Sequence, residues 1–295
     1  MDTSDLTNIK NIINNQTFYR AVVEDNNDPK KLNRVKVRIM GIHPEDSTNV
    51  PTSCLPWAEV IAPVLFGLSS GIGISGLPNN GSYVWVFFEG DSHNQPIVLG
   101  ACYGMSKEKQ TGGFTDPDGV FPVQNRLAEP DTNRLARNEV LSKTVIGVKV
   151  SNREKGVPTS EGKTWSEPEP QNHRTEYPNN TVIETKTGHV IEIDDTPGNE
   201  RIHIYHRTGT YLEMFPDGTS VNKIVKDEFR IVDGNRNTLV KQNDSRTVYG
   251  SDEELISGNQ TSKISESKFV EVGGTTTHKS GGVTTIKGSA IHLNP

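Results

Sequence analysis

The stretch "RTVYGSDEELISGNQTSKISESKFVEVGG", residues 246–274, places an aliphatic residue at every eighth position. The aliphatic residues that keep this spacing are Val232, Val240, Val248, Ile256, Ile264 and Val272. Glycine recurs two positions later in the same register, at Gly234, Gly250, Gly258, Gly274 and Gly282, while Gln242 and Glu266 occupy that position in other octads. A helix repeats every 3.6 residues and a strand every two, so neither explains a period of eight by itself.

An octad of this kind suits one extended segment followed by one bend. Alternate side chains of an extended segment point the same way, so each octad turns its aliphatic residue inward and polar residues such as Glu253 and Gln260 outward. One chain with one inward aliphatic per octad cannot enclose a core, whereas three chains around a common axis can. We expect the glycines at bends that need a positive φ or a close backbone approach. The alternative is a single-chain β-solenoid, which usually needs more inward residues in each coil.

The composition agrees with a long fold that has a narrow core. Of 295 residues only 32% are hydrophobic, and the 27 glycines and 17 prolines suit turn-rich β structure. The formal net charge of -6 argues against general nucleic-acid binding. Cys54 and Cys102 lie in apolar contexts without a CxxC pattern, which predicts two buried free thiols. The polar N-terminus predicts no secretory signal, and no apolar run reaches 18 residues.

Five strand-like segments in residues 18–104 predict a small closed barrel of the OB type. They are "FYRAVVED" (18–25), "RVKVRIMGI" (34–42), "LPWAEVIAP" (55–63), "SYVWVFFEG" (82–90) and "QPIVLGACYG" (95–104). The second alternates Val35, Val37 and Ile39 with Arg34, Lys36 and Arg38, which predicts a half-buried strand with its charges in water. The apolar, glycine-rich loop 64–81 is expected to contact a partner.

The rest of the chain divides by composition. Residues 1–17 read as an N-terminal arm and residues 105–175 as an extended linker, because hydrophobic periodicity is poor there. Residues 176–230 are predicted to be β-strands leading into the octads, with turns at 196–199 and 216–218. Residues 231–295 are predicted to form the octapeptide-repeat β-helix. The predicted fold class is therefore all-β: an N-terminal OB-fold barrel, an extended linker and a C-terminal trimeric, intertwined, triple-stranded β-helix.

Several long strings resemble one family. They are "VVEDNNDPKKLNRVKVRIMGIHP" (22–44), "SGIGISG" (70–76), "PIVLGACYG" (96–104), "GFTDPDGVFP" (113–122) and "TKTGHVIEIDDTPGNERIHIYHRTGTYLEMFPDGT" (185–219), followed by the octads. Together they resemble the central spike, or cell-puncturing, protein of contractile-tailed T-even-like phages and its type VI secretion relative VgrG. This resemblance covers most of the chain.

The resemblance implies a virion protein of the tail baseplate that punctures the host envelope when the sheath contracts, as part of a contractile injection system. It implies a homotrimer that binds a baseplate hub protein through the OB domain and a small PAAR-like tip protein at the C-terminus, with no cofactor, no metal and no nucleic acid. The best-known phage member carries a lysozyme domain between barrel and spike. Here that position holds only residues ~123–175, so we expect no catalytic residue.

Three alternatives stay open at this level. A peptidoglycan hydrolase would need one of Glu154, Glu161, Glu167 or Glu169 in a folded cleft, but all lie in sequence that reads as exposed. A nucleic-acid-binding OB protein would use the Arg34/Lys36/Arg38 face, which lacks an aromatic stacking platform. His278 and His292 would form rings of three on a trimer axis, although ordinary packed or surface histidines are expected there.

Overall fold

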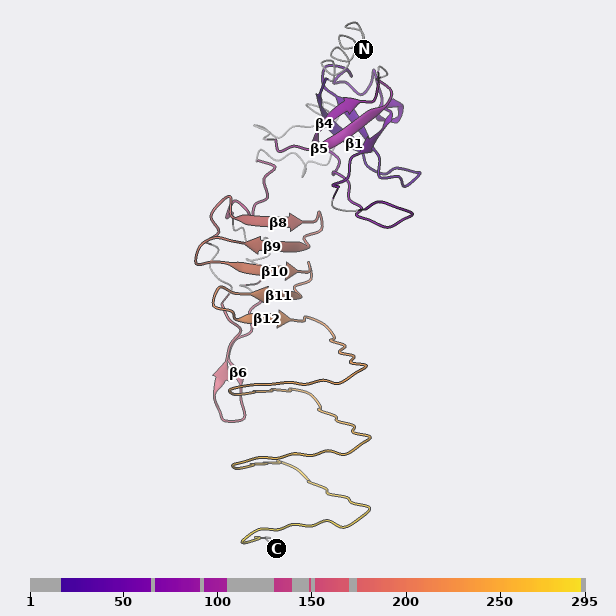
Figure 1. Cartoon of the computed structure of the whole chain (residues 1–295). Coiled ribbons are helices and arrows are strands. Elements are labelled where there is room, and N and C mark those ends of the chain that lie inside the picture. The colour runs from indigo at the N-terminus through magenta and orange to yellow at the C-terminus, as the bar shows by residue number, and fades with distance from the viewer. Residues whose placement is uncertain are drawn as a thin grey trace, which may run out of the picture. The chain divides into compact units, whose positions relative to one another are not determined.

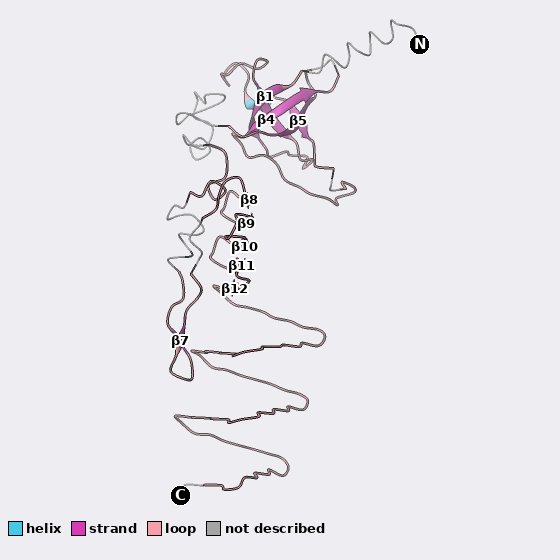
Figure 2. Ribbon diagram, turned by 60° about the vertical axis from the view of Figure 1, so that its left-hand side comes forward, coloured by secondary structure: helices cyan, strands magenta, loops and turns pink. Residues whose placement is uncertain are grey.

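The computed structural model describes residues 17–64, 67–90, 93–104, 130–139, 149, 152–169 and 174–292. The chain separates into two compact units, residues 1–241 and 242–295. Regular structure in the described residues is dominated by strands, with a 3₁₀ helix η1 (Thr52–Cys54) between two of them. The predicted all-β class is confirmed (Figure 1, Figure 2). No helix within the described ranges is both long enough and apolar enough to span a bilayer.

The N-terminal strands form the predicted closed barrel. The strands are β1 (Tyr19–Asp25), β2 (Val35–Ile39), β3 (Trp57–Val60), β4 (Tyr83–Phe88) and β5 (Pro96–Ala101). They close in the order β1-β2-β3-β5-β4, with β1 and β4 antiparallel at the closure and β3 and β5 parallel. The barrel core comprises Ala21, Val23, Val35, Val37, Ile39, Ala58, Val84, Val86, Phe88 and Val98. These are the alternate, inward positions that the strand pattern requires.

The charged face of β2 differs from its prediction, because all five residues of this strand are buried. Arg38 donates to both carboxylate oxygens of Glu24 and to the carbonyls of Pro44 and Val50. Lys36 donates to the carbonyls of Thr52 and Ser53. The segment that follows β2 therefore folds over the strand's outer face and supplies the acceptors that a buried cation needs. The expectation of solvated charges on this strand is wrong.

A second sheet is a five-stranded antiparallel meander. Its strands are β8 (Asn180–Glu184), β9 (Val190–Asp194), β10 (Arg201–Tyr205), β11 (Tyr211–Met214) and β12 (Ser220–Lys223), in spatial order β12-β11-β10-β9-β8. The sequence predicts the first turn of this region at 196–199, but an earlier turn at 185–189 separates β8 from β9, and Gly188 takes a φ of +89° there. A short hairpin, β6 (Val157–Pro158) with β7 (Thr164–Trp165), precedes this sheet.

Beyond β12 the chain bends once in every octad. Bends recur at 233–234, 241–242, 249–250, 257–258, 265–266, 273–274 and 281–282, and the residues between them are extended without a strand partner in the same chain. In residues 242–292 the trace winds as an open coil (Figure 1). None of the five repeat glycines has a positive φ, and a Cβ on any of them would meet nothing within 4 Å. The expected need for left-handed backbone or close approach at these glycines is thus wrong within one chain, because the bends are open.

Candidate assembly surfaces

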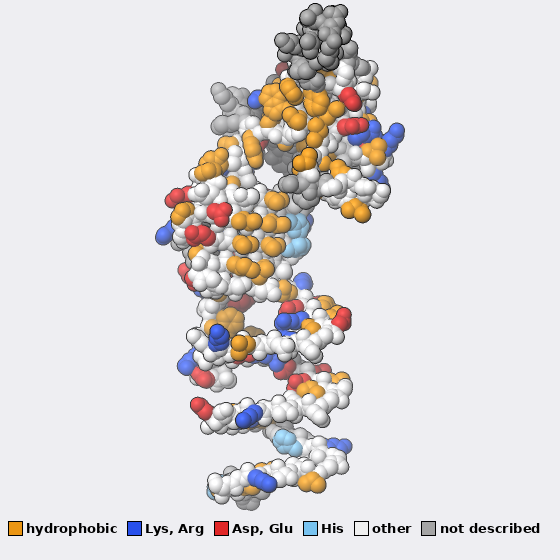
Figure 3. Space-filling model, viewed as in Figure 1, with side chains coloured by type: hydrophobic (Ala, Val, Ile, Leu, Met, Phe, Trp, Pro, Cys, Tyr) orange, Lys and Arg blue, Asp and Glu red, His pale blue; other side chains and the backbone are white. Residues whose placement is uncertain are grey.

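The two faces of the β8–β12 sheet have the opposite polarity from an ordinary amphipathic sheet. Apolar side chains on one face remain solvent-exposed, with exposed fractions of 43–63%; they are Ile183, Ile191, Ile193, Ile202, Ile204 and Met214. Figure 3 shows the hydrophobic side chains gathered on this face. The other face carries charged residues, and these are fully buried. We call the first the isoleucine face and the second the ionic face.

The isoleucine face is continuous across the strands because the register pairs its members. Ile202 lies opposite Ile193 on β9 and Met214 on β11, and Ile204 lies opposite Ile191. Contiguous exposed apolar patches on proteins mark interaction sites. Complete burial of an isoleucine stabilises by about 1.5–3 kcal/mol, so each half-exposed side chain has roughly 1 kcal/mol left to gain from a partner.

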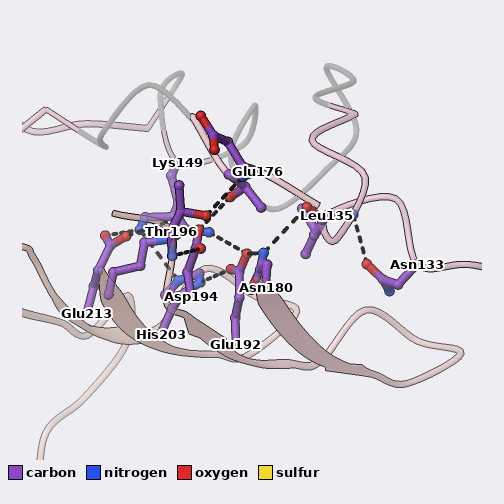
Figure 4. Close-up of polar contacts among 12 residues, drawn as sticks. Asn133, Leu135, Lys149, Glu176, Asn180, Glu192, Asp194, Thr196, His203 and Glu213 are labelled. Atoms are coloured by element: carbon purple, nitrogen blue, oxygen red, sulfur yellow. Dashed lines mark hydrogen bonds and ion pairs between the residues drawn. The ribbon is translucent and has the colours of Figure 1, made fainter. Parts of the chain in front are cut away.

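The ionic face is a connected row of buried polar groups on neighbouring strands (Figure 4). Glu192 accepts hydrogen bonds from Arg201 and, at 2.7 Å, from Asn180 Nδ2; its other oxygen lies 3.4 Å from His203 Nδ1. Lys149 Nζ lies 3.4 Å from His203 Nε2 and donates to Glu213. Every member of this row has a relative exposure of 6% or less.

Asp194 and Lys149 make further contacts on the ionic face. Asp194 accepts from Thr175 Oγ1 at 2.5 Å and from the Thr196 backbone N–H at 3.0 Å. Lys149 Nζ also lies 4.1 Å from the centre of the Tyr211 ring. Buried charges are tolerated only when they are paired and hydrogen-bonded, which is the arrangement here.

Burial sets the protonation of this row. Desolvation lowers the pKa of His203 below its ordinary value, and the Lys149 cation adds to this effect, although Glu192 and Glu213 oppose it. Desolvation also lowers the pKa of Lys149 despite its pairing with Glu213. His203 is therefore neutral in the folded protein at pH 7.

One of the four candidate hydrolase carboxylates lies on this side of the sheet and is buried. Glu167 accepts hydrogen bonds from Tyr211 Oη, from Lys223 Nζ at 2.7 Å and from the Glu154 backbone N–H at 3.1 Å. Burial alone would raise the pKa of Glu167, but these donors outweigh it and leave the pKa lowered. The expected exposure of Glu167 is wrong, whereas Glu154, Glu161 and Glu169 are exposed. Glu167 ties the segment before the sheet to β11 and β12.

The octad aliphatics form the second candidate surface. Val232, Val240, Val248, Ile256, Ile264 and Val272 are 42–51% exposed. Apolar residues directly beside them in sequence are far more exposed: Ile231, Leu239, Tyr249 and Leu255 reach 81–93%. Successive side chains of an extended segment point to opposite sides, so the octad residues share the sheltered side of the coil. Each of the five repeat glycines occupies the second position of a bend.

The third candidate assembly surface is the loop 64–81 between β3 and β4. Its described residues Val64, Leu68, Ile72 and Ile74 are exposed, with Val64 at 98%. Ser69 and Ile72 exchange backbone hydrogen bonds of 2.8 and 3.1 Å, which turn the loop back on itself. An exposed apolar loop with its own internal pairing is suited to contact with another protein.

The sequence also singles out the two cysteines, two histidines and a basic strand face. No group of three or more histidine, cysteine or acidic residues in the described ranges is placed to hold a metal ion. Both cysteines are free. Cys54 is exposed and Cys102 is partly exposed, so the predicted burial of both thiols is wrong. Cys54 lies at the end of η1, in the segment that covers β2. Arg34, a member of the basic face, makes hydrogen bonds of 2.8 and 2.9 Å to Asp28 and lowers the pKa of that carboxyl. His278 and His292 are exposed within the single chain.

The isoleucine face was missed by the sequence reading. Its signal was present, because isoleucine occupies every second position in "VIEID" (190–194) and "RIHIY" (201–205), with Glu192, Asp194, Arg201 and His203 among the residues between. Ordinary alternation places isoleucine inward and the charges outward. The structure reverses this, since Lys149 and Thr175 supply partners to His203, Glu213 and Asp194.

Comparisons with known proteins agree with this architecture. A family model described as the Gp5 N-terminal OB domain matches residues 41–200, more than half of the chain. Protein Gp5 of Vibrio phage KVP40 is 36% identical over 267 residues, covering 79% of this chain and 63% of the relative. The pre-baseplate central spike protein Gp5 of Enterobacteria phage T4 is 41% identical over 133 residues, covering 42% of this chain and 22% of the relative. The chain thus spans less than two thirds of the length of these relatives.

Proposed function

Because the chain belongs to the Gp5 family of phage baseplate spike proteins, we propose that it forms the central, cell-puncturing spike of a contractile tail as an intertwined homotrimer. The relatives are baseplate proteins, which is consistent with a location in the virion tail baseplate. The spike role is structural. Membership of the family does not by itself give puncturing, trimer formation or the triple-stranded β-helix, and we propose these for this chain.

The observation that supports a trimer is that one chain has two surfaces without a partner. The isoleucine face is apolar and exposed, and the octad aliphatics are sheltered on one side without a partner strand. A second and third copy would cover both surfaces at once. Residues 231–295 would then supply three aliphatics to each layer, and backbone groups that lack a ladder would pair between chains.

The domain scheme follows from the same reasoning. Residues 18–104 form the OB barrel, residues 105–175 are the linker, residues 176–230 form the strands that precede the octads in sequence, and residues 231–295 form the β-helix. We place the hub protein at the barrel, where loop 64–81 offers an apolar contact, and a PAAR-like tip protein at the C-terminal end. The relation to VgrG rests on the sequence strings alone.

The action we propose is mechanical, with no catalysis, cofactor or nucleic acid. Support comes from internal contacts of the residues considered for catalysis and nucleic-acid binding. Glu167 accepts hydrogen bonds from Tyr211 and Lys223, and Arg38 donates to Glu24. Intertwined chains would resist unfolding under load because strands of different chains would have to separate together. A separate protein or domain would cut peptidoglycan.

Hydrogen exchange of the full chain tests the architecture. Backbone amides of residues 231–292 have no strand partner within one chain, so a monomer would exchange them rapidly. Interchain ladders would protect them as strongly as the barrel strands. Fast exchange over the octads with protection confined to residues 19–101 and 180–223 would contradict the proposal.

The role is tested by locating the chain in intact virions. An antibody against the barrel, imaged by electron microscopy, is expected to label the centre of the baseplate. Label on the tail tube or the capsid would contradict a central spike.

A further inference from the structure

We propose that His189 and His206 form a two-histidine site for a transition-metal ion that imidazole binds, such as Zn²⁺, Ni²⁺ or Cu²⁺. The site lies where β9 and β10 end, next to Ile191 and Ile204 at the end of the isoleucine face. It goes beyond the proposed spike function and does not depend on it. Figure 3 shows histidine side chains beside the hydrophobic face of the sheet.

The sheet register brings the two histidines together. Tyr205 is paired with Val190 at the end of the β9–β10 ladder, so the next position on each strand places His206 opposite His189. Their ring centroids are 4.5 Å apart and the ring planes are inclined by 55°. His206 is exposed and His189 is partly exposed, so an ion can reach both rings from solvent.

Two similar turns hold the rings in place. The His189 backbone N–H donates to Thr185 Oγ1 at 3.0 Å, and Thr185 N–H donates to the His189 carbonyl at 2.9 Å. His206 N–H donates to the Thr210 carbonyl at 2.8 Å. Each turn contains a glycine of positive φ, +89° at Gly188 and +103° at Gly209, which other residues rarely adopt.

His206 also has the outer contact that metal-binding histidines usually have. Its Nδ1 lies 2.8 Å from Thr208 Oγ1. With the proton on Nδ1 donated to that hydroxyl, Nε2 keeps its lone pair for a metal ion and the ring orientation is fixed. The Thr208 backbone N–H lies 3.3 Å from the same nitrogen, so the other tautomer competes when no ion is bound.

The spacing suits chelation by imidazole. Two nitrogens at Zn–N distances of about 2.0–2.1 Å around a tetrahedral ion lie about 3.4 Å apart, which rings with nearby centroids can supply. Imidazole favours zinc, copper and nickel, whereas magnesium and calcium prefer oxygen. Since no larger ligand group is present in the described residues, water would fill the remaining positions. A bound ion would link the β8–β9 turn to the β10–β11 turn.

Isothermal titration of the full chain with NiCl₂ tests the site, with ZnCl₂ and MgCl₂ in parallel. We expect one Ni²⁺ per chain, binding of Zn²⁺ to the same site, and no heat from Mg²⁺. His189→Ala and His206→Ala should each weaken Ni²⁺ binding at least tenfold, because a single imidazole no longer chelates. His278→Ala is the matched control and should bind as the unchanged protein does.

A second measurement separates loss of the site from loss of the fold. Without metal, both variants should melt within a few degrees of the unchanged protein, and only the unchanged protein should gain thermal stability from Ni²⁺. If an alanine variant does not fold, the glutamine variant at that position replaces it. Undiminished Ni²⁺ binding by both variants would overturn the proposal. So would one ion per three chains that is lost in His278→Ala or His292→Ala, because that ion would lie on a trimer axis.

Discussion

Ile256→Asp, compared with Leu255→Asp, distinguishes the inside of the octad coil from the outside. The two residues are neighbours and receive the same carboxylate, but Ile256 is 42% exposed and Leu255 is 93% exposed in the single chain. If three chains pack around an axis, Ile256 becomes buried together with its two copies, whereas Leu255 stays in water.

The magnitude follows from burial and charge. Truncation of a buried isoleucine costs about 2–5 kcal/mol. Keeping one buried aspartate protonated at pH 7 costs a further ~4 kcal/mol, because its ordinary pKa is about 3.9 and each pKa unit is worth about 1.36 kcal/mol. Three such side chains in one layer exceed the roughly 5–15 kcal/mol that stabilises a typical domain. Leu255→Asp should stay within ~0.5 kcal/mol of neutral.

The assay is SDS resistance and thermal melting of the full-length chain. The unchanged protein and Leu255→Asp should remain trimeric under conditions that dissociate Ile256→Asp. Equal behaviour of the two variants would refute the proposed register. Failure of Leu255→Asp with survival of Ile256→Asp would mean that inside and outside are exchanged.

Three further predictions concern the ionic face and the barrel. Burial lowers the pKa of His203, so below about pH 6.5 the unfolded chain takes up a proton that the folded chain does not. The melting temperature should therefore fall from pH 7 to pH 5, and His203→Gln should flatten that profile. Glu213→Ala leaves Lys149 buried without its carboxylate and should cost about 3–5 kcal/mol in denaturant unfolding, against less than ~0.5 kcal/mol for the exposed Glu253→Ala. Replacing residues 67–74 of the loop by a short turn should leave the barrel's melting nearly unchanged, because Leu77 and Gly81, which contact the barrel, are kept. Hub binding in a pull-down should be lost, and retained hub binding would refute the loop assignment.

The barrel could be predicted from sequence because its strands follow local rules. In β4, inward Val84 and Val86 alternate with Tyr83 and Trp85, and a turn-rich segment precedes it. Such alternation reports which side chains face a core that the same strands enclose. Five such segments in succession therefore predict a small closed barrel.

The polarity of other strands could not be predicted because distant segments decide it. Arg38 is buried by Glu24 and the segment after β2, and Glu213 is buried by Lys149, 64 residues away. Local alternation cannot show that a charged face will be covered and an isoleucine face left open. The octad register, by contrast, can be predicted from the sequence, because the aliphatic residue stands at the same position in every octad.

The mass of the protein in solution tests the central claim most directly. Light scattering coupled to size exclusion should give about 98 kDa, three chains of 32.5 kDa, at concentrations down to the nanomolar range. A stable species of about 32.5 kDa would contradict the intertwined trimer, because the chain would then fold without its copies.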